Sequence, residues 1–274
     1  MKTTRHPAGF TLLELLVVIA MIALGASILV PALARTRANS PAFKCLDNLR
    51  QLTVAWSMYN GDYNNSLLTC ENGISGRVNW CTGVLSFSAT SLNWDVNQAI
   101  ARSPLWSYTG SNAAAFKCPA DQSAVSVNGV WKPRVRSYSM SQAFSTGTWL
   151  DKAPNPGQTV WRTYANGAQI VIPAKTFLFV DEHPSSINDS AFANVCTGAQ
   201  PTDPPSAAQI IDFPASPHHG AGGFSFTDGH LDMHKWLGSK IKPPPSNSYL
   251  ALNVTAGDSW MDIQWLAQNT TVKR

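Results

Sequence analysis

The sequence predicts an α+β protein, in which a long amino-terminal helical spine leads into a loop-rich head that contains a small antiparallel sheet. An apolar run over residues 10–34 holds a single charge, and apolar residues continue at helical spacing to about residue 60. The rest of the chain is rich in glycine, proline and tryptophan. Within it, two alternating segments flank the turn signal Asp228 and Gly229.

The composition excludes several classes of protein. The chain has 274 residues, enough for one large domain with a real core. Only 13% of residues are charged, about half the usual share, which excludes a disordered charged tail. The net charge of +4 is not gathered into a basic block, so no nucleic-acid partner is expected.

The apolar run begins abruptly after a polar, basic segment at residues 1–9. As a helix, residues 10–34 would be about 37 Å long, enough to span a bilayer. A signal peptide or a simple anchor would also give such a run, but neither explains Glu14, because a carboxylate in an apolar span needs a partner. If the chain is cut between Gly9 and Phe10, the new amine lies one helical turn from Glu14 and is a natural partner, its own or a neighbour's.

The junction resembles the prepilin leader and cleavage site of type IV pilins and type II secretion pseudopilins. Gly9 would precede the cut, Phe10 would follow it, and Glu14 would be the fifth mature residue, where these proteins carry a glutamate. Pro31 stands where many of them have a helix-kinking proline. The resemblance implies cleavage after Gly9 by a prepilin peptidase, N-methylation of Phe10, and assembly that depends on Phe10, Glu14 and Pro31.

This resemblance also sets the expected domains and location. Residues 1–9 would be the leader, 10–34 a transmembrane and filament-core helix, 35–60 the helical spine of the head, and 61–274 a pseudopilin-like globular head. The protein would cross the inner membrane once, with its head in the periplasm or on an extracellular filament. Its partners would be other copies or other pseudopilins, the prepilin peptidase and the membrane.

Local patterns predict several elements of the head. Short helices are expected near residues 97–108 and 111–116, and a buried strand over 176–180. The clearest hairpin joins 222–227 to 230–236 through a type I′ turn, with Leu231 and Met233 facing inward and the intervening residues on the other face. A terminal helix from Ser259 to about Gln268 would be N-capped by Asp258. The head resembles pseudopilin-like families of planctomycetes and verrucomicrobia that carry a His-x9-Asp-Gly motif, through the segments 45–52, 116–121, 180–183, 186–189 and 218–229.

Histidines and carboxylates in the second half of the head make a metal site one interpretation. Calcium would bind the oxygens or a transition metal the imidazoles, and the resemblance to type II major pseudopilins favours calcium. The other interpretation is structural, with Asp228 and Gly229 shaping a turn and a histidine bonding nearby backbone. The candidate ligands are Asp181, Asp189, His218, His219 and Asp228.

The five cysteines form no CxxC pair, so a disulfide framework is expected in an exported chain. We expect Cys70 to pair with Cys81 across a short loop, and Cys45 to pair with Cys118, tying the spine to the head. Cys196 would be left over.

Three functions compete. The first is a structural, non-enzymatic filament subunit. The second is a displayed polysaccharide-binding protein that uses exposed tryptophans, of which the chain has ten. The third is a metal-dependent hydrolase, although neither a serine nucleophile elbow nor an HExxH motif is present. Tryptophans gathered on one exposed face would favour the binder, and buried tryptophans the structural subunit.

Overall fold

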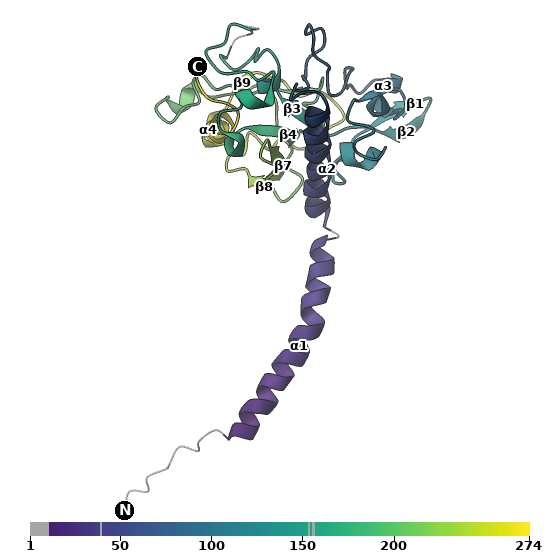
Figure 1. The fold of residues 1–274 in the computed structure, drawn as a ribbon, viewed down its shortest axis with the longest axis vertical. Helices are drawn as coiled ribbons and strands as arrows, with labels where there is room; N and C mark the ends of the chain where they lie inside the picture. Colours follow the sequence, from purple (N-terminus) through teal and green to yellow (C-terminus); the bar gives the residue numbers. More distant parts are fainter. Residues whose placement is uncertain (1–10, 39, 153, 155–156) are drawn as a thin grey trace, which may run out of the picture.

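The computed structural model describes residues 11–274 except 39, 153, 155 and 156, without the side chains of residues 28–38. Its amino-terminal part consists of two helices, α1 (Leu12–Ala38) and α2 (Pro41–Asp62). α1 projects from the head, and α2 is embedded in it (Figure 1). The expected helical spine is present, and α1 continues through Pro31.

The sequence around Ser40 explains why a second helix begins there. The Ser40 hydroxyl accepts a hydrogen bond from Phe43 N at 3.2 Å and caps α2, with Pro41 at its first helical position. Proline fixes a helical φ at this position and its missing N–H is not needed there, whereas the residue before it is pushed towards extended backbone. Ser40 has φ −66° and ψ 142°, as this rule requires.

The head is built on one five-stranded sheet with the order β5-β3-β4-β7-β8. β3 and β5 are parallel, and the other neighbours are antiparallel. Two further two-stranded antiparallel sheets are formed by β1 with β2 and by β6 with β9. The α+β class is confirmed, and so is the strand expected over 176–180. The strands are β1 (Ala124–Val127), β2 (Val130–Pro133), β3 (Tyr138–Ser141), β4 (Phe177–Asp181), β5 (Ala191–Phe192), β6 (Gln209–Ile210), β7 (Ala221–Phe226), β8 (Leu231–Lys235) and β9 (Val254–Thr255).

The expected hairpin is the pair β7-β8, but its turn differs from the expected type. Gly229 has φ +93°, and Asp228 does not have a positive φ, which a type I′ turn requires. Gly229 N donates to Phe226 O at 2.9 Å, and Phe226 N donates to His230 O at 3.0 Å. This is a three-residue loop with glycine in the left-handed region, the geometry that combines a type I turn with a bulge.

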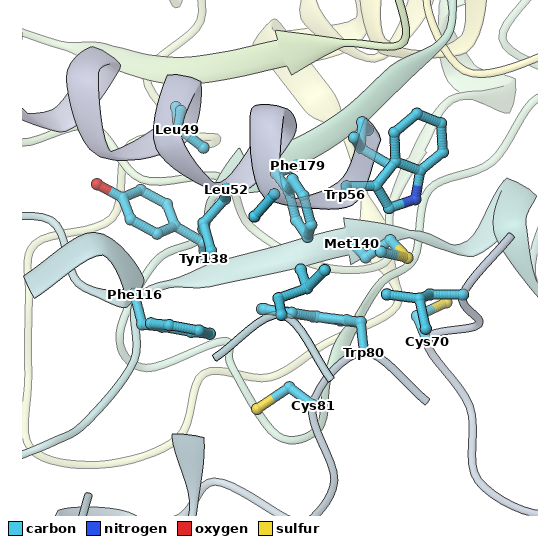
Figure 2. Packing of buried hydrophobic residues seen from close by; sticks show 14 of the residues in the cluster. Leu49, Leu52, Trp56, Cys70, Trp80, Cys81, Phe116, Tyr138, Met140 and Phe179 are labelled. Atoms are coloured by element: carbon cyan, nitrogen blue, oxygen red, sulfur yellow. The ribbon is translucent and has the colours of Figure 1, made fainter. Parts of the chain in front are cut away.

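Helix α2 covers one side of this sheet. Leu49, Leu52 and Trp56 of the helix pack among Tyr138 and other buried residues of the first core cluster, which also holds Met140 and Phe179 (Figure 2). The fit depends on a glycine. A Cβ at Gly223 of β7 would lie 2.8 Å from Leu49 Cδ1 and 3.3 Å from Cys45 Sγ. The absence of a side chain at Gly223 therefore lets the helix approach the strand closely.

A second buried cluster lies against the carboxy-terminal helix α4 (Trp260–Gln268). Phe224 of β7 packs edge-to-face on Trp265 of α4 and on Trp236, which follows β8. His234 stacks on Trp265 with ring centroids 3.6 Å apart. The face that we expected opposite Leu231 and Met233 is therefore also covered, and all six residues of β7 are buried.

Two smaller expectations need correction. Ser259, not Asp258, occupies the N-cap of α4 and no side chain caps the helix. Asp258 instead accepts hydrogen bonds from the backbone N–H groups of Ser239 and Lys240, which fixes the loop after β8. The helices expected near 97–108 and 111–116 are present as short 3₁₀ turns, Ile100–Arg102 and Ala113–Phe116. One further short helix, α3, spans Ser91–Trp94.

Many apolar side chains of α1 are exposed to solvent in the isolated chain. The exposed fraction is 76% for Leu12, 66% for Ile22 and 71% for Leu24. Among the described residues, no helix combines the length and apolarity that a membrane crossing needs. Figure 1 shows that α1 projects away from the head, so the head does not cover these apolar side chains.

A buried carboxyl predicts how the stability of the head depends on pH. Asp212 is 6% exposed and its Oδ2 accepts a hydrogen bond from Ala193 N at 2.6 Å. Burial nevertheless raises the pKa of Asp212 to about 8, from 3.8 for the free side chain. The folded state therefore holds a proton that the unfolded state has lost, and stability falls as pH rises from about 4 to about 8.

Replacement of Asp212 by asparagine is expected to flatten this dependence. Each pKa unit corresponds to about 1.4 kcal/mol, so the carboxyl destabilises the fold by at most about 4 kcal/mol between pH 5 and pH 8. Thermal unfolding followed by circular dichroism should give similar melting temperatures for both proteins at pH 5. At pH 8, Asp212→Asn should melt several degrees higher. Parallel pH profiles for the two proteins would contradict the assignment.

Candidate functional site

Four side chains that can bind a metal meet beneath the surface of the head. Cys45 comes from α2, Cys118 follows the 3₁₀ turn at Ala113–Phe116, Asp181 ends β4, and His218 lies in the turn before β7. All four are buried, and one donor atom from each lies within 4.8 Å of the others. Among the described residues, this is the one group of three or more histidines, cysteines and carboxylates gathered so closely.

The donor atoms of the four side chains lie close together. His218 Nε2 lies 3.2 Å from Cys118 Sγ and 3.6 Å from Asp181 Oδ2. Cys45 Sγ lies 3.5 Å from the same Asp181 Oδ2. The hydroxyl of Tyr138 lies 3.4 Å from Cys45 Sγ and also donates to the Cys45 carbonyl at 3.3 Å, which holds this cysteine in place.

Burial controls the charges of the metal-free cluster. Burial raises the pKa of the Cys45 thiol, and the hydrogen bond with Cys45 together with burial raises that of Cys118. Burial also raises the pKa of Asp181, partly offset by His218. Burial lowers the pKa of His218, but its hydrogen bonds with Asp181 and Cys118 outweigh this and raise the pKa to about 9. Both thiols are therefore protonated at neutral pH when no cation replaces their protons.

The arrangement is not that of a thiol nucleophile with its base. In such a triad the histidine contacts the thiol through one ring nitrogen and the acid through the other. Here Cys118 and Asp181 both face His218 Nε2. The raised thiol pKa values also remove the thiolate that would attack a substrate. The geometry is one of ligands converging on a point, so the cluster matches a metal site better than a catalytic one.

The structure brings together only two of the five candidate ligands. Asp181 and His218 belong to the cluster. Asp189 Oδ1 instead accepts a hydrogen bond from Ala191 N at 2.8 Å, and His219 is exposed with φ +55°. Asp228 Oδ1 accepts from His230 N at 3.1 Å and lies 2.6 Å from His230 Nδ1, which fixes the hairpin turn. The structural interpretation therefore holds for Asp228, and the oxygens expected to bind calcium do not converge.

All five cysteines are free thiols, so the structure contains neither expected disulfide. Cys70 Sγ contacts the Ser141 carbonyl at 3.5 Å rather than Cys81. Cys45 and Cys118 are nevertheless neighbours, as their expected pairing requires. Their expected proximity is therefore confirmed, but no sequence pattern predicted that Asp181 and His218 lie beside them. The four residues are far apart in the sequence, so no short spacing indicates that they form one group.

The tryptophans are packed rather than displayed. Only Trp131, on β2, is exposed, and the other nine are buried or half-buried. Trp80 and Trp236 are almost completely buried and their ring nitrogens donate to the carbonyls of Ser190 and Ala215, both at 2.9 Å. By the criterion set from the sequence, this burial favours the structural subunit over a polysaccharide binder.

The amino-terminal site is described only in part. Gly9 and Phe10 lie outside the described residues, and Pro31 is described only as backbone within α1. Glu14 is exposed, and its Oε2 accepts hydrogen bonds from Thr11 N at 2.9 Å and Thr11 Oγ1 at 2.7 Å. Glu14 N donates back to Thr11 Oγ1 at 3.3 Å. This reciprocal pair is a capping box at the start of α1, which the sequence analysis did not anticipate.

Comparison with known proteins bears on this amino-terminal part. Residues 4–30 match the family model of the prokaryotic N-terminal methylation motif. The chain is similar to the type II secretion system core protein G of Aeromonas hydrophila, with 37% identity over 75 residues. That stretch is 27% of this chain and 52% of the relative, so the chain spans about half the length of the curated relative it matches. No solved structure gives a significant match.

These similarities support a pseudopilin-like protein over its amino-terminal part. They do not extend to the His-x9-Asp-Gly segment of the head, residues 218–229, so the expected relation of the head to particular bacterial groups stays a prediction.

Proposed function

We propose that this chain is a filament-forming pseudopilin or pilin-like subunit of a type II secretion or type IV pilus-like system. The observation that carries the proposal is the junction at Gly9 and Phe10, which lies inside the methylation motif of residues 4–30 and directly precedes α1. The chain acts by polymerising, with its amino-terminal helices side by side and its heads outside.

The bare apolar surface of α1 supports this proposal. Ten large apolar side chains between Leu12 and Leu24 are exposed in the isolated chain. An exposed patch of this kind marks an interface with lipid or protein. We place residues 10–34 in the inner membrane as a single span before assembly, and among the helices of neighbouring subunits afterwards. The head then lies in the periplasm or on an extracellular filament.

The partners follow from the same arrangement. A prepilin peptidase removes residues 1–9 and methylates Phe10, and the mature chain assembles with its own copies or with other pseudopilins. The packed tryptophans and the absence of a triad geometry at His218 favour this structural role over sugar binding or hydrolysis.

Mass spectrometry of the mature protein is expected to show an N-terminal, methylated Phe10. The cut falls there because the chain changes from polar to apolar between Gly9 and Phe10. Gly9→Val is the matched variant, and it should retain residues 1–9 while remaining folded. A mature terminus near residue 35 in the wild type would identify a signal peptide instead and would overturn the proposed function.

A further inference from the structure

We propose that Cys45, Cys118, Asp181 and His218 bind one zinc ion, which fastens helix α2 to the sheet of the head. The site is independent of the filament role, since its ligands all lie outside the amino-terminal motif. Its four ligands come from four separate segments of the chain, so one ion would hold together α2, the turn after Phe116, the end of β4 and the turn before β7.

Three of the six distances between donor atoms are close to those of a tetrahedral site, and the others are at most 4.8 Å. With Zn–S of about 2.3 Å and Zn–N or Zn–O of about 2.0 Å, the edges of a ligand tetrahedron are about 3.3–3.8 Å. The three measured edges are 3.2 Å between Cys118 Sγ and His218 Nε2, 3.5 Å between Cys45 Sγ and Asp181 Oδ2, and 3.6 Å between His218 Nε2 and Asp181 Oδ2. Little movement would be needed to close the site around an ion.

The donor types select zinc over calcium. Calcium takes six to eight oxygen ligands, and this cluster offers a single carboxylate. Two thiolates with an imidazole and a carboxylate suit zinc, which favours four-coordinate nitrogen and sulfur sites. The Tyr138 hydroxyl, 3.4 Å from Cys45 Sγ, can donate to the thiolate and orient it, as outer-shell groups do in metal sites.

The ion would replace protons of its ligands. On binding, the thiols of Cys45 and Cys118 each release a proton to solvent, and His218 binds as neutral imidazole after losing its own extra proton. With two thiolates, one carboxylate and a neutral imidazole around the dipositive ion, the whole site has a net charge of −1. Cys118 lines a surface pocket with Lys117 and Asp121, and Asp181 lines a second pocket of about 290 Å³. Two of the buried ligands therefore lie next to surface pockets.

The same two thiols cannot serve a disulfide and a zinc ion at once. A Cys45–Cys118 disulfide would form by loss of two electrons to an external oxidant, whereas zinc binding requires both thiols reduced. The structure holds them as free thiols beside two further ligands that a disulfide would not use. The convergence of Asp181 and His218 on the pair is what favours zinc.

The test uses the full-length chain in detergent, extracted with an alkylating reagent present. Elemental analysis is expected to find about one zinc per chain, with Cys45 and Cys118 protected from alkylation until a chelator is added. After chelation, added Co²⁺ should give sulfur-to-cobalt charge-transfer absorption that reports thiolate ligands directly. Chelation should also lower the melting temperature, and added zinc should restore it, so the wild-type protein alone tests the proposal.

Variants locate the site. Cys118→Ser should abolish the charge-transfer band of one thiolate and weaken zinc binding more than about 100-fold, since loss of an outer-shell partner alone costs about 10–100-fold. Asp181→Asn serves if Cys118→Ser does not fold. Cys196→Ser is the matched control, a buried free thiol in the other core cluster, and should bind zinc as the wild type does. Extracted protein without zinc, a recovered Cys45–Cys118 disulfide, or unchanged binding in Cys118→Ser would each overturn the proposal. None of these results depends on filament assembly.

Discussion

Glu14→Leu is expected to leave a processed, membrane-inserted protein that does not enter filaments. Inside a filament α1 is buried among other apolar helices, where an unpaired carboxylate costs several kcal/mol, so Glu14 needs the methylated amine of Phe10 on a neighbouring subunit. That pairing also fixes the axial stagger, because a slip of one turn separates the charges. Filaments sheared from cells that lack the wild-type copy should fall to background, with unchanged amounts of mature protein in the membrane.

Two variants of the capping box at the start of α1 can distinguish the effect of the Glu14 charge from the effect of its capping hydrogen bonds. Glu14 accepts two hydrogen bonds from Thr11 in the isolated chain. Glu14→Gln can keep these bonds but loses the charge, whereas Thr11→Val keeps the charge and loses the hydroxyl. We expect Glu14→Gln to fail in assembly and Thr11→Val to assemble. Normal filaments from Glu14→Gln would show that the cap, rather than an ion pair, is what Glu14 contributes.

Gly222→Ala is expected to destabilise the head strongly. A Cβ at Gly222 would lie 2.5 Å from the backbone carbonyl oxygen of Ala215 and 3.3 Å from Trp236 Nε1. That carbonyl already accepts a hydrogen bond from Trp236 Nε1 at 2.9 Å, so neither group can yield without breaking the other contact. Overpacking of this kind costs about 3 kcal/mol. Thermal unfolding should show a loss of about 6–12 °C.

Two other glycines provide matched controls for this measurement. At Gly223 the new methyl group would meet the flexible end of Leu49, which can turn away, so Gly223→Ala should cost less, about 1 kcal/mol. Gly61 lies on the exposed side of α2 with open space around it, and Gly61→Ala should gain about 0.5–1 kcal/mol. Equal melting temperatures for Gly222→Ala and Gly61→Ala would contradict the steric argument.

The elements that the sequence predicted correctly are those specified by neighbouring residues. Alternation around Asp228 and Gly229 predicts β7 and β8, because a hairpin is made by one continuous stretch of chain. The start of α2 could also have been predicted from Ser40 and Pro41, because a capping residue followed by proline is typical of a helix start. The turn type was missed because Asp-Gly also fits a three-residue loop with only the glycine left-handed.

The candidate site could be predicted only in pieces. Asp181 and His218 were recognised as ligand types, and Cys45 and Cys118 as partners of each other. Nothing local joins the two pairs, because β4 and β7 must first align in the sheet and α2 must pack on β7. The order β5-β3-β4-β7-β8 is a property of tertiary pairing, and no single segment of the sequence contains it.

The packing of α2 on β7 and β8 has a consequence for how the protein is made. Roughly 160 residues separate the end of this helix from the strands that cover it. Synthesis proceeds from the amino terminus, so the apolar face of α2 stays uncovered until residues 221–235 have been made. Contacts so distant along the chain form slowly, and the waiting surface is prone to aggregate. The yield of folded head should therefore depend on how long α2 stays uncovered after it has been made.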